Sequence, residues 1–265
     1  MPTLEKSESK GQAFWTKRLQ AHGHTGWADP VIYAYDQLER LALIDEAISN
    51  SPRGNGIALD FGCGVGDFSK LLLRHGFKVC GYDPFVQPKI DSESFTYANS
   101  YDAIPLGVNS ATLAISITTL DHILDERELL HALATIHKHL NCAGVFYMLE
   151  YALDATSDRD RFGHKNNYQS LRTLSEWTRL LNQSAFRIKD VRPVPHPLLS
   201  PSLGYTEYVR SSIVRMRKRY GRLPIANYWL DYMLRRRAAK LIRQFPPTLN
   251  NSTLTPLKLF RCRVA

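Results

Sequence analysis

The stretch LDFGCGVGD, residues 59–67, decides the fold of this chain. It predicts a buried strand, a turn built of glycines and the start of a helix. The glycines at 62, 64 and 66 carry no side chain where the backbone must turn tightly and a ligand must come close. A second apolar run ends at Asp83, whose carboxylate is placed to bind the two hydroxyls of a ribose. Together the two motifs predict a nucleoside-containing cofactor at the end of a parallel sheet.

The spacing of the glycines indicates which cofactor this is. The dinucleotide-binding fingerprint has its third glycine three positions after the second. Here Gly66 follows Gly64 by two positions, and Asp60 precedes Gly62 by two. This acid-x-G-x-G-x-G pattern resembles the first motif of the class I S-adenosylmethionine-dependent methyltransferases, and the resemblance extends over about residues 57–153. It implies S-adenosyl-L-methionine as the cofactor and methyl transfer as the activity.

Short apolar runs alternate with helix-length segments along the chain, which predicts crossover units and a parallel sheet. We expect strands at 57–61, 78–82, 95–98, 112–117, 145–150, 187–192 and 257–264, helices at 68–74 and 127–140, and a turn at 141–144. The predicted fold class is α/β and Rossmann-like. It has a seven-stranded, mostly parallel sheet with helices on both faces and a basic helical insertion before the last strand.

The resemblance also implies a set of cofactor-binding residues. They follow the first four strands and comprise Asp60, Gly62, Cys63, Gly64, Gly66, Asp83, Pro84, Asn99, Ser100, Tyr101 and Thr118. Asp83 is expected to bind the ribose, with capping after its strand as the alternative. Asp60 is expected near the methionine amine, or else holds the glycine turn. Asn99 stands where many relatives carry an acid that binds the adenine amino group, and its amide can do the same.

Residues 14–51 precede the first strand and are rich in aromatic side chains. Asp29-Pro30 marks the start of a helix predicted at 32–48. In the methyltransferases that this chain resembles, such segments fold over the cofactor and shape the acceptor pocket. On that basis Tyr33 and Arg40 are expected at the methionine carboxylate. Packing of both side chains against the sheet is the alternative.

Three residues are candidates for catalysis. His122 follows the fourth strand and is the first candidate for a general base, because imidazole exchanges protons near working pH. Orientation of its own loop is the alternative role. Glu150 is expected to end the fifth strand at the same cleft edge. His164 is expected to line the acceptor side, or else lies in a solvent-exposed turn.

The net charge of +9 is concentrated in one segment. Residues 205–245 hold eleven basic residues and two acidic ones, so the rest of the chain is neutral. Apolar residues at steps of three and four predict two helices there. As an insertion over the ligand-binding end of the sheet, they would meet an anionic acceptor, a nucleic acid or an anionic membrane surface. The alternative is a helical pair packed on the core with a solvated basic face.

Length and composition fit one core with appendages, since the chain has 265 residues and 44% hydrophobic content. We expect an N-terminal helical cap at 1–51, a cofactor-binding core at 52–194, a basic lid at 195–250 and the last strand at 251–265. No apolar run reaches membrane-spanning length and the first ten residues are polar, so we expect a cytoplasmic protein with no secretory signal. The cysteines at 63, 80, 142 and 262 form no C-x-x-C pair, which favours buried reduced thiols over disulfides or a metal site.

Three functions remain open at this point. The first is a methyltransferase for an anionic small-molecule or glycan acceptor. The second is a nucleic-acid (RNA) methyltransferase that uses the basic helices. The third is a non-catalytic cofactor-binding module that docks to an acidic partner. We favour the first, because the sequence holds no RNA-binding module and no N-P-P-Y-type tetrapeptide. The oligomeric state is not predicted.

Overall fold

The computed structural model describes residues 4–26, 30–49, 56–155, 168–194 and 257–265. The chain divides into two compact units. The first comprises residues 1–25, 48–193 and 256–265. The second comprises residues 26–47 and 194–255. The predicted basic helices and lid fall in 195–256, outside the described residues.

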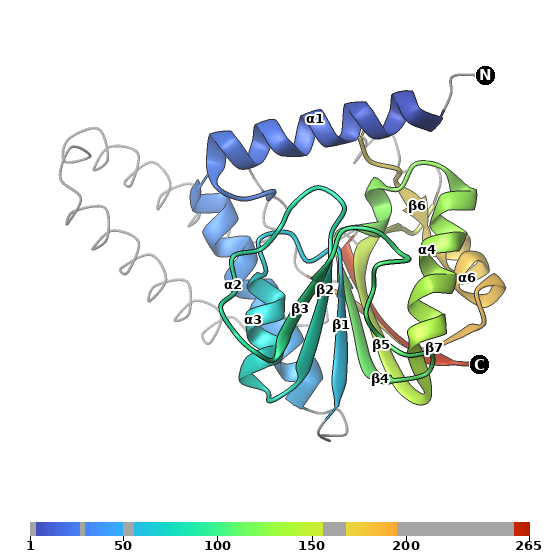
Figure 1. Cartoon of the computed structure of the whole chain (residues 1–265). Helices are drawn as coiled ribbons and strands as arrows, with labels where there is room; N and C mark the ends of the chain where they lie inside the picture. Colours follow the sequence, from blue (N-terminus) through green and yellow to red (C-terminus); the bar gives the residue numbers. More distant parts are fainter. Residues whose placement is uncertain (1–3, 27–29, 50–55, 156–167, 195–256) are drawn as a thin grey trace. The chain divides into compact units, whose positions relative to one another are not determined.

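The first unit is built on a sheet whose strands follow the order β3-β2-β1-β4-β5-β8-β7 (Figure 1). The strands are β1 (Ile57–Phe61), β2 (Lys78–Tyr82), β3 (Phe95–Ala98), β4 (Ala111–Ile117), β5 (Leu140–Leu153), β7 (Phe186–Pro193) and β8 (Leu257–Val264). All neighbours from β3 to β5 are parallel, and β8 runs antiparallel to both β5 and β7. A two-residue strand, β6 (Arg172–Thr173), pairs with the end of β5. The predicted mostly parallel, Rossmann-like sheet is confirmed.

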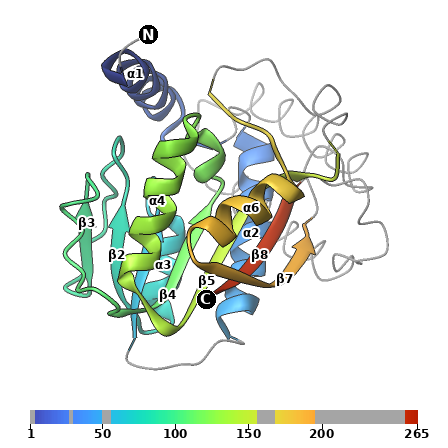
Figure 2. The same ribbon diagram turned by 90° about the vertical axis from the view of Figure 1, so that its right-hand side faces the viewer.

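The strands are parallel and buried because helices cover both faces of the sheet. Helix α3 (Asp67–Arg74) lies on one face, and α4 (Glu126–His139) and α6 (Leu174–Gln183) lie side by side on the other (Figure 1). Figure 2 shows α4 and α6 in front of the sheet with α3 behind it. Such strands read as continuous apolar runs, and β1 and β4 are buried along almost their whole length. The apolar runs in the sequence therefore predicted these strands closely.

Two helix starts are fixed by side-chain caps. Asp125 accepts hydrogen bonds from two backbone N–H groups in the first turn of α4. At the start of α6, Thr173 and Glu176 form a capping box, in which each side chain accepts from the other residue's backbone N–H. The pattern T-x-x-E at 173–176 is visible in the sequence, so α6 could have been predicted from it.

The fifth strand was predicted, but its bounds and the turn before it were predicted wrongly. β5 spans Leu140–Leu153, so it includes the expected turn at 141–144 and continues three residues past Glu150. Leu140 pairs with Ala111, and the register shifts before Val145 pairs with Leu113. Turn-forming residues were therefore accommodated as an irregularity inside the strand. The expectation that all four cysteines are buried is also wrong, because Cys142 in this stretch is exposed, although no disulfide forms.

Two helices precede the sheet in the sequence. Helix α1 (Leu4–His22) belongs to the first unit and was not predicted as a separate helix. Helix α2 (Pro30–Ser49) belongs for the most part to the second unit and confirms the helix predicted at 32–48. No helix in the described part of the chain is long and apolar enough to cross a membrane.

Candidate functional site

The glycine turn joins β1 to α3 and is held against the end of β2. The backbone N–H groups of Gly62 and Cys63 both donate to the carbonyl oxygen of Tyr82, at 2.7 and 2.9 Å. Gly62, Gly64 and Gly66 have φ angles of 82°, 51° and 86°. These angles lie in the left-handed region that side-chain-bearing residues rarely adopt. The sequence of the turn is therefore required by its backbone.

Two of the three glycines also allow close packing. A Cβ atom on Gly62 would collide with the side chain of Thr119, which follows β4. A Cβ atom on Gly66 would lie 2.6 Å from Cδ1 of Ile90. Gly62 and Gly66 thus let neighbouring segments contact the turn directly.

Gly64 differs because the backbone of the described residues leaves more room around it than around Gly62 or Gly66. A Cβ atom there would meet the hydroxyl of Thr25, with Oγ1 at 3.3 Å. A bare backbone with the carboxylate of Asp83 beside it is what a nucleoside cofactor requires. The turn therefore fits S-adenosylmethionine as its sequence predicted. Thr25 was not singled out in the sequence, and no local pattern marks it.

The Asp83 carboxylate is directly coupled to the glycine turn. Its Oδ2 accepts from the N–H of Gly64 at 3.0 Å, and its Oδ1 accepts from the N–H groups of Phe85 and Val86 at 2.9 and 2.8 Å. Burial raises the pKa of Asp83 above its ordinary value, and these three N–H bonds oppose the rise. The hydroxyl of Tyr97 donates to the backbone carbonyl of Asp83 at 2.6 Å. The carboxylate is thus fixed beside Gly64.

Asp60 is buried beneath the turn and lies on β1. Ser69 of α3 donates its hydroxyl to Oδ2 of Asp60 at 2.6 Å. Burial raises the pKa of Asp60 from its ordinary value of 3.8 to about 7, with a further rise from nearby Asp83. The bond to Ser69 opposes this rise and ties the first helix turn to the strand. This contact corresponds to the alternative role, in which Asp60 holds the glycine turn.

The remaining cofactor candidates lie at the carboxyl ends of β2, β3 and β4. Pro84, Asn99 and Ser100 are exposed. The ring of Tyr101 packs 5.1 Å from that of Tyr82. Thr118 has a φ of 49°, which is uncommon for a residue with a side chain and marks a sharp bend after β4. These ends therefore lie along one edge of the sheet.

Glu150 does not end its strand at a cleft edge. It is fully buried within β5, and its carboxylate accepts backbone N–H bonds from the turn that follows β4. Oε1 accepts from Thr119 at 2.9 Å and from Leu120 at 2.8 Å, and Oε2 accepts from Asp121 at 3.4 Å. Burial and the neighbouring Asp121 raise the pKa of Glu150 well above its ordinary value. These bonds organise the turn.

Arg172 holds the same turn from its other end. This buried guanidinium donates to the carbonyl oxygen of Ile123 at 2.8 Å and, more weakly, to that of Leu120 at 3.5 Å. It lies over the ring of Trp177, 5.2 Å from the centroid. Burial lowers the pKa of Arg172, and the nearby Glu150 carboxylate opposes that effect. Nothing in the sequence distinguishes this arginine from the many others.

His122 lies in the short 3-10 helix η1 (Leu120–His122) of that turn. Its Nδ1 lies 2.6 Å from the carbonyl oxygen of Tyr168, and because a carbonyl only accepts, Nδ1 carries the proton. Nε2 lies 3.6 Å from Oδ1 of Asp121, whose buried carboxylate also accepts from Gln169 at 2.5 Å. The His122 side chain is 28% exposed, so the ring remains accessible.

Aromatic residues of α1 contact this turn and the segment beside it. The ring of Phe14 stacks on that of Tyr168 with centroids 4.1 Å apart. The ring of Trp15 meets that of His122 edge-on at 4.8 Å. The aromatic crowding of the N-terminal region is therefore partly explained by contacts of α1 with the end of the sheet.

The other three predicted site residues lie on α2 or outside the described residues. Tyr33 and Arg40 lie on α2 in the second unit. Arg40 makes two contacts with the carboxylate of Asp36, at 2.9 and 2.8 Å, and Tyr33 accepts from Gln37 at 3.2 Å. His164 lies outside the described residues.

Solved structures with a similar fold include three methyltransferases. A SAM-dependent methyltransferase from Leishmania major has a TM-score of 0.58 and 14% identity, with 97% of this chain and 83% of that chain covered. The 1,6-didemethyltoxoflavin-N1-methyltransferase of Burkholderia thailandensis was solved with 1,6-didemethyltoxoflavin and S-adenosylhomocysteine bound. It has a TM-score of 0.56 and 16% identity, with 100% of this chain and 92% of that chain covered. Phosphoethanolamine N-methyltransferase 2 of Haemonchus contortus was solved in complex with S-adenosyl-L-methionine. It has a TM-score of 0.57 and 15% identity, with 94% of this chain and 59% of that chain covered.

The search of curated proteins found no match. A family model described as a methyltransferase domain matches residues 33–188, which is more than half of the chain. These residues include the glycine turn, Asp83, the turn after β4 and most of the parallel sheet. The chain therefore belongs to the methyltransferase domain family, as a class I, S-adenosylmethionine-dependent member with a Rossmann-like core.

Proposed function

We propose that this protein transfers a methyl group from S-adenosylmethionine to a small-molecule or glycan acceptor that carries negative charge. One observation carries the proposal. The Asp83 carboxylate accepts from the backbone N–H of Gly64, a residue that leaves the backbone bare beside this carboxylate. A carboxylate and a bare backbone at the end of adjacent parallel strands are suited to a ribose and the chain attached to it.

The residues after the first four strands would hold the cofactor. Asp83 would bind the ribose hydroxyls and Asn99 the adenine amino group. Tyr33 and Arg40 remain proposed contacts of the methionine carboxylate. When bound, S-adenosylmethionine supplies a sulfonium methyl group that is already electrophilic. The protein then needs mainly to hold a nucleophile in line at short distance.

His122 is the proposed proton acceptor for a hydroxyl or ammonium acceptor. Its Nδ1–H donates to the carbonyl of Tyr168, which leaves the lone pair on Nε2. A proton taken by Nε2 would be stabilised by Oδ1 of Asp121, 3.6 Å away. The role proposed for Glu150 is to position the turn that carries His122, and His164 remains a proposed acceptor-side residue.

The acceptor class is proposed from two features. Two structures of similar fold are named for small-molecule acceptors, 1,6-didemethyltoxoflavin and phosphoethanolamine. In addition, the excess of nine positive charges falls in residues 205–245, which favours an anionic partner. The same charge supports a nucleic acid as the second candidate acceptor. A membrane-linked acceptor is a variant of the first.

Calorimetry with S-adenosylhomocysteine tests the cofactor site. We expect Asp83→Ala to weaken binding at least about tenfold, since it removes charge-assisted hydrogen bonds worth about 1.5–3 kcal/mol. The matched control is Glu93→Ala, which removes an exposed carboxylate and should leave affinity unchanged. Saturable binding of a nicotinamide dinucleotide in place of S-adenosylhomocysteine would contradict the proposal.

The acceptor is tested with methyl-labelled S-adenosylmethionine and fractionated cell extracts. We expect label in a low-molecular-weight or glycan fraction that binds to an anion-exchange resin. Label that stays in a polymer fraction and is released by ribonuclease would support the nucleic-acid alternative instead. Binding of S-adenosylhomocysteine without label transfer to any fraction would support the non-catalytic module.

A further inference from the structure

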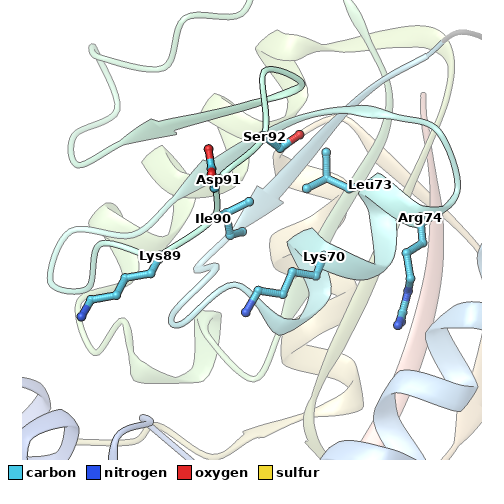
Figure 3. Close-up of a pocket in the computed structure, with 7 residues that line it drawn as sticks. All are labelled: Lys70, Leu73, Arg74, Lys89, Ile90, Asp91 and Ser92. Carbon is cyan, nitrogen blue, oxygen red and sulfur yellow. The ribbon is translucent and has the colours of Figure 1, made fainter.

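A hollow of about 440 Å³ lies between α3 and the segment that follows β2 (Figure 3). Lys70, Leu73 and Arg74 of α3 line one side of it. Lys89 and Ile90 line the other side, and both residues belong to the first unit. The hollow is wide open to solvent, so its side chains are accessible to a ligand.

The hollow and the glycine turn have different residues. Ile90 forms part of the wall of the hollow, and Cδ1 of Ile90 lies 2.6 Å from the position that a Cβ on Gly66 would take. Pro88 approaches the same position to 3.0 Å. The segment after β2 is thus packed against the end of the glycine turn, and none of the residues that line the hollow belongs to that turn.

The charges around the hollow are not balanced. Lys70, Arg74 and Lys89 contribute three cations, and Asp91 contributes the single carboxylate. In Figure 3 the three cationic ends point to the same side, whereas the Asp91 carboxylate points away from them. Within the described residues, no hydrogen bond or ion pair engages the side chains of these three cations. Their donors are therefore available to a ligand.

We propose that this hollow binds a small ligand that carries two or more phosphate groups. Lysine ammonium groups act as point charges toward phosphate, and the guanidinium of Arg74 can bind two of its oxygens. Leu73 and Ile90 offer an apolar wall for the rest of the ligand. A nucleic-acid strand would instead need a row of cations that continues along the surface. Three cations around one hollow favour a compact ligand.

Calorimetric titration with pyrophosphate tests this site on the full-length protein. The variant Lys70→Gln/Lys89→Gln removes one cation from each side of the hollow and should weaken pyrophosphate binding about tenfold or more. The matched control, Lys138→Gln/Arg187→Gln, removes two exposed cations elsewhere and should bind like the wild type. Absence of pyrophosphate binding, or an equal loss in both variants, would overturn the proposal.

Two further measurements test whether the hollow is distinct from the cofactor site and whether its ligand is a compact phosphate compound. S-adenosylhomocysteine should bind the Lys70→Gln/Lys89→Gln variant normally and should not be displaced by pyrophosphate. Displacement of S-adenosylhomocysteine by pyrophosphate would place the anion in the cofactor site and overturn the proposal. Failure of the wild type to bind S-adenosylhomocysteine would refute only the proposed function. A twenty-nucleotide single-stranded DNA should bind no tighter than pyrophosphate. Tighter binding that also weakens in the control variant would indicate a nucleic-acid surface instead.

Discussion

Asp60 and Glu150 are two buried carboxylates near the same end of the sheet, and they differ in their bonding. Asp60 accepts from a single hydroxyl, that of Ser69, and burial dominates its pKa. Glu150 accepts three backbone N–H groups of one turn. Since both pKa values are raised, the protonated form of each side chain is favoured by folding. We therefore expect Asp60→Asn and Glu150→Gln to change the stability of the protein in different ways.

The substitution Asp60→Asn should flatten the pH dependence of stability. The pKa of Asp60 rises on folding from 3.8 to about 7, so between these values the folded state binds more protons than the unfolded state. Its contribution is full below pH 4 and is lost as the pH rises through about 7. Each unit of that shift corresponds to about 1.4 kcal/mol. Asparagine cannot titrate and can still accept from Ser69.

Urea unfolding of both proteins between pH 4.5 and 7.5 measures this effect. The stability of Asp60→Asn relative to the wild type should improve by about 2 kcal/mol or more across that range. The other carboxyl groups whose pKa is raised are present in both proteins, so their contributions to the pH dependence cancel in the comparison. Parallel curves for the two proteins would show that Asp60 is ionised in the folded state throughout.

Glu150→Gln and Glu150→Leu test whether the hydrogen bonds accepted by Glu150 hold the turn after β4. Both short bonds end on Oε1, so the single amide oxygen of glutamine can keep them. Leucine keeps the volume but leaves the N–H groups of Thr119 and Leu120 buried without acceptors, at about 1–3 kcal/mol each. We expect Glu150→Gln to unfold at nearly the wild-type urea concentration and Glu150→Leu well below it. S-adenosylhomocysteine affinity should follow the same order. Equal destabilisation by both substitutions would show that the negative charge is required.

At the scale of elements, the glycine turn is where three segments meet. The end of β2 accepts its N–H groups, Thr119 after β4 packs on Gly62, and Ile90 packs on Gly66. Among the described residues, a Cβ on Gly64 would meet just the hydroxyl of Thr25. The turn therefore combines two packing positions with one binding position, and substitutions should distinguish them.

Gly62→Ala and Gly76→Ala form a matched pair for this turn. Both glycines have similar positive φ angles, 82° and 84°, so both substitutions carry the same backbone strain of about 1 kcal/mol. A Cβ at Gly76 meets nothing within 4 Å, whereas one at Gly62 collides with Thr119. Gly62→Ala should therefore cost about 1–3 kcal/mol more in urea unfolding. It should also weaken S-adenosylhomocysteine binding, which Gly76→Ala should leave intact. Equal unfolding free energies would mean that the turn after β4 moves freely.

The turn after β4 is held from two sides. Glu150 accepts its N–H groups, and Arg172 binds the carbonyl oxygens of Leu120 and Ile123. The segment 168–172 adds the carbonyl of Tyr168 to His122. Because the backbone groups of the turn are satisfied at both ends, the position of His122 depends on residues distant in the sequence.

At the scale of the whole molecule, the parallel sheet could be predicted because its strands are buried on both faces. The runs at 57–61, 78–82 and 95–98 match β1, β2 and β3 residue for residue. The bounds of β5 could not be predicted, because pairing with β4 begins at Leu140, ahead of the turn-forming residues, and pairing with β8 and β6 carries the strand past Glu150. Helix α6 was missed although its capping box is a local signal.

The candidate site, too, could be predicted from the sequence only in part. The glycine turn and Asp83 could be paired from the sequence, because adjacent parallel strands end at one edge of the sheet. The contacts of Trp15 with His122 and of Arg172 with Ile123 join segments more than forty residues apart. No local pattern encodes such contacts. The roles of Tyr33, Arg40 and His164 stay predictions.

The sequence by itself determined the strands, the glycine turn and the cofactor class, since backbone freedom and continuous apolar burial are local properties. The tertiary structure alone decided that Glu150 is buried and binds the backbone, that Arg172 supports the same turn, and that Thr25 approaches Gly64. These outcomes depend on which distant groups meet and on how far they are removed from water.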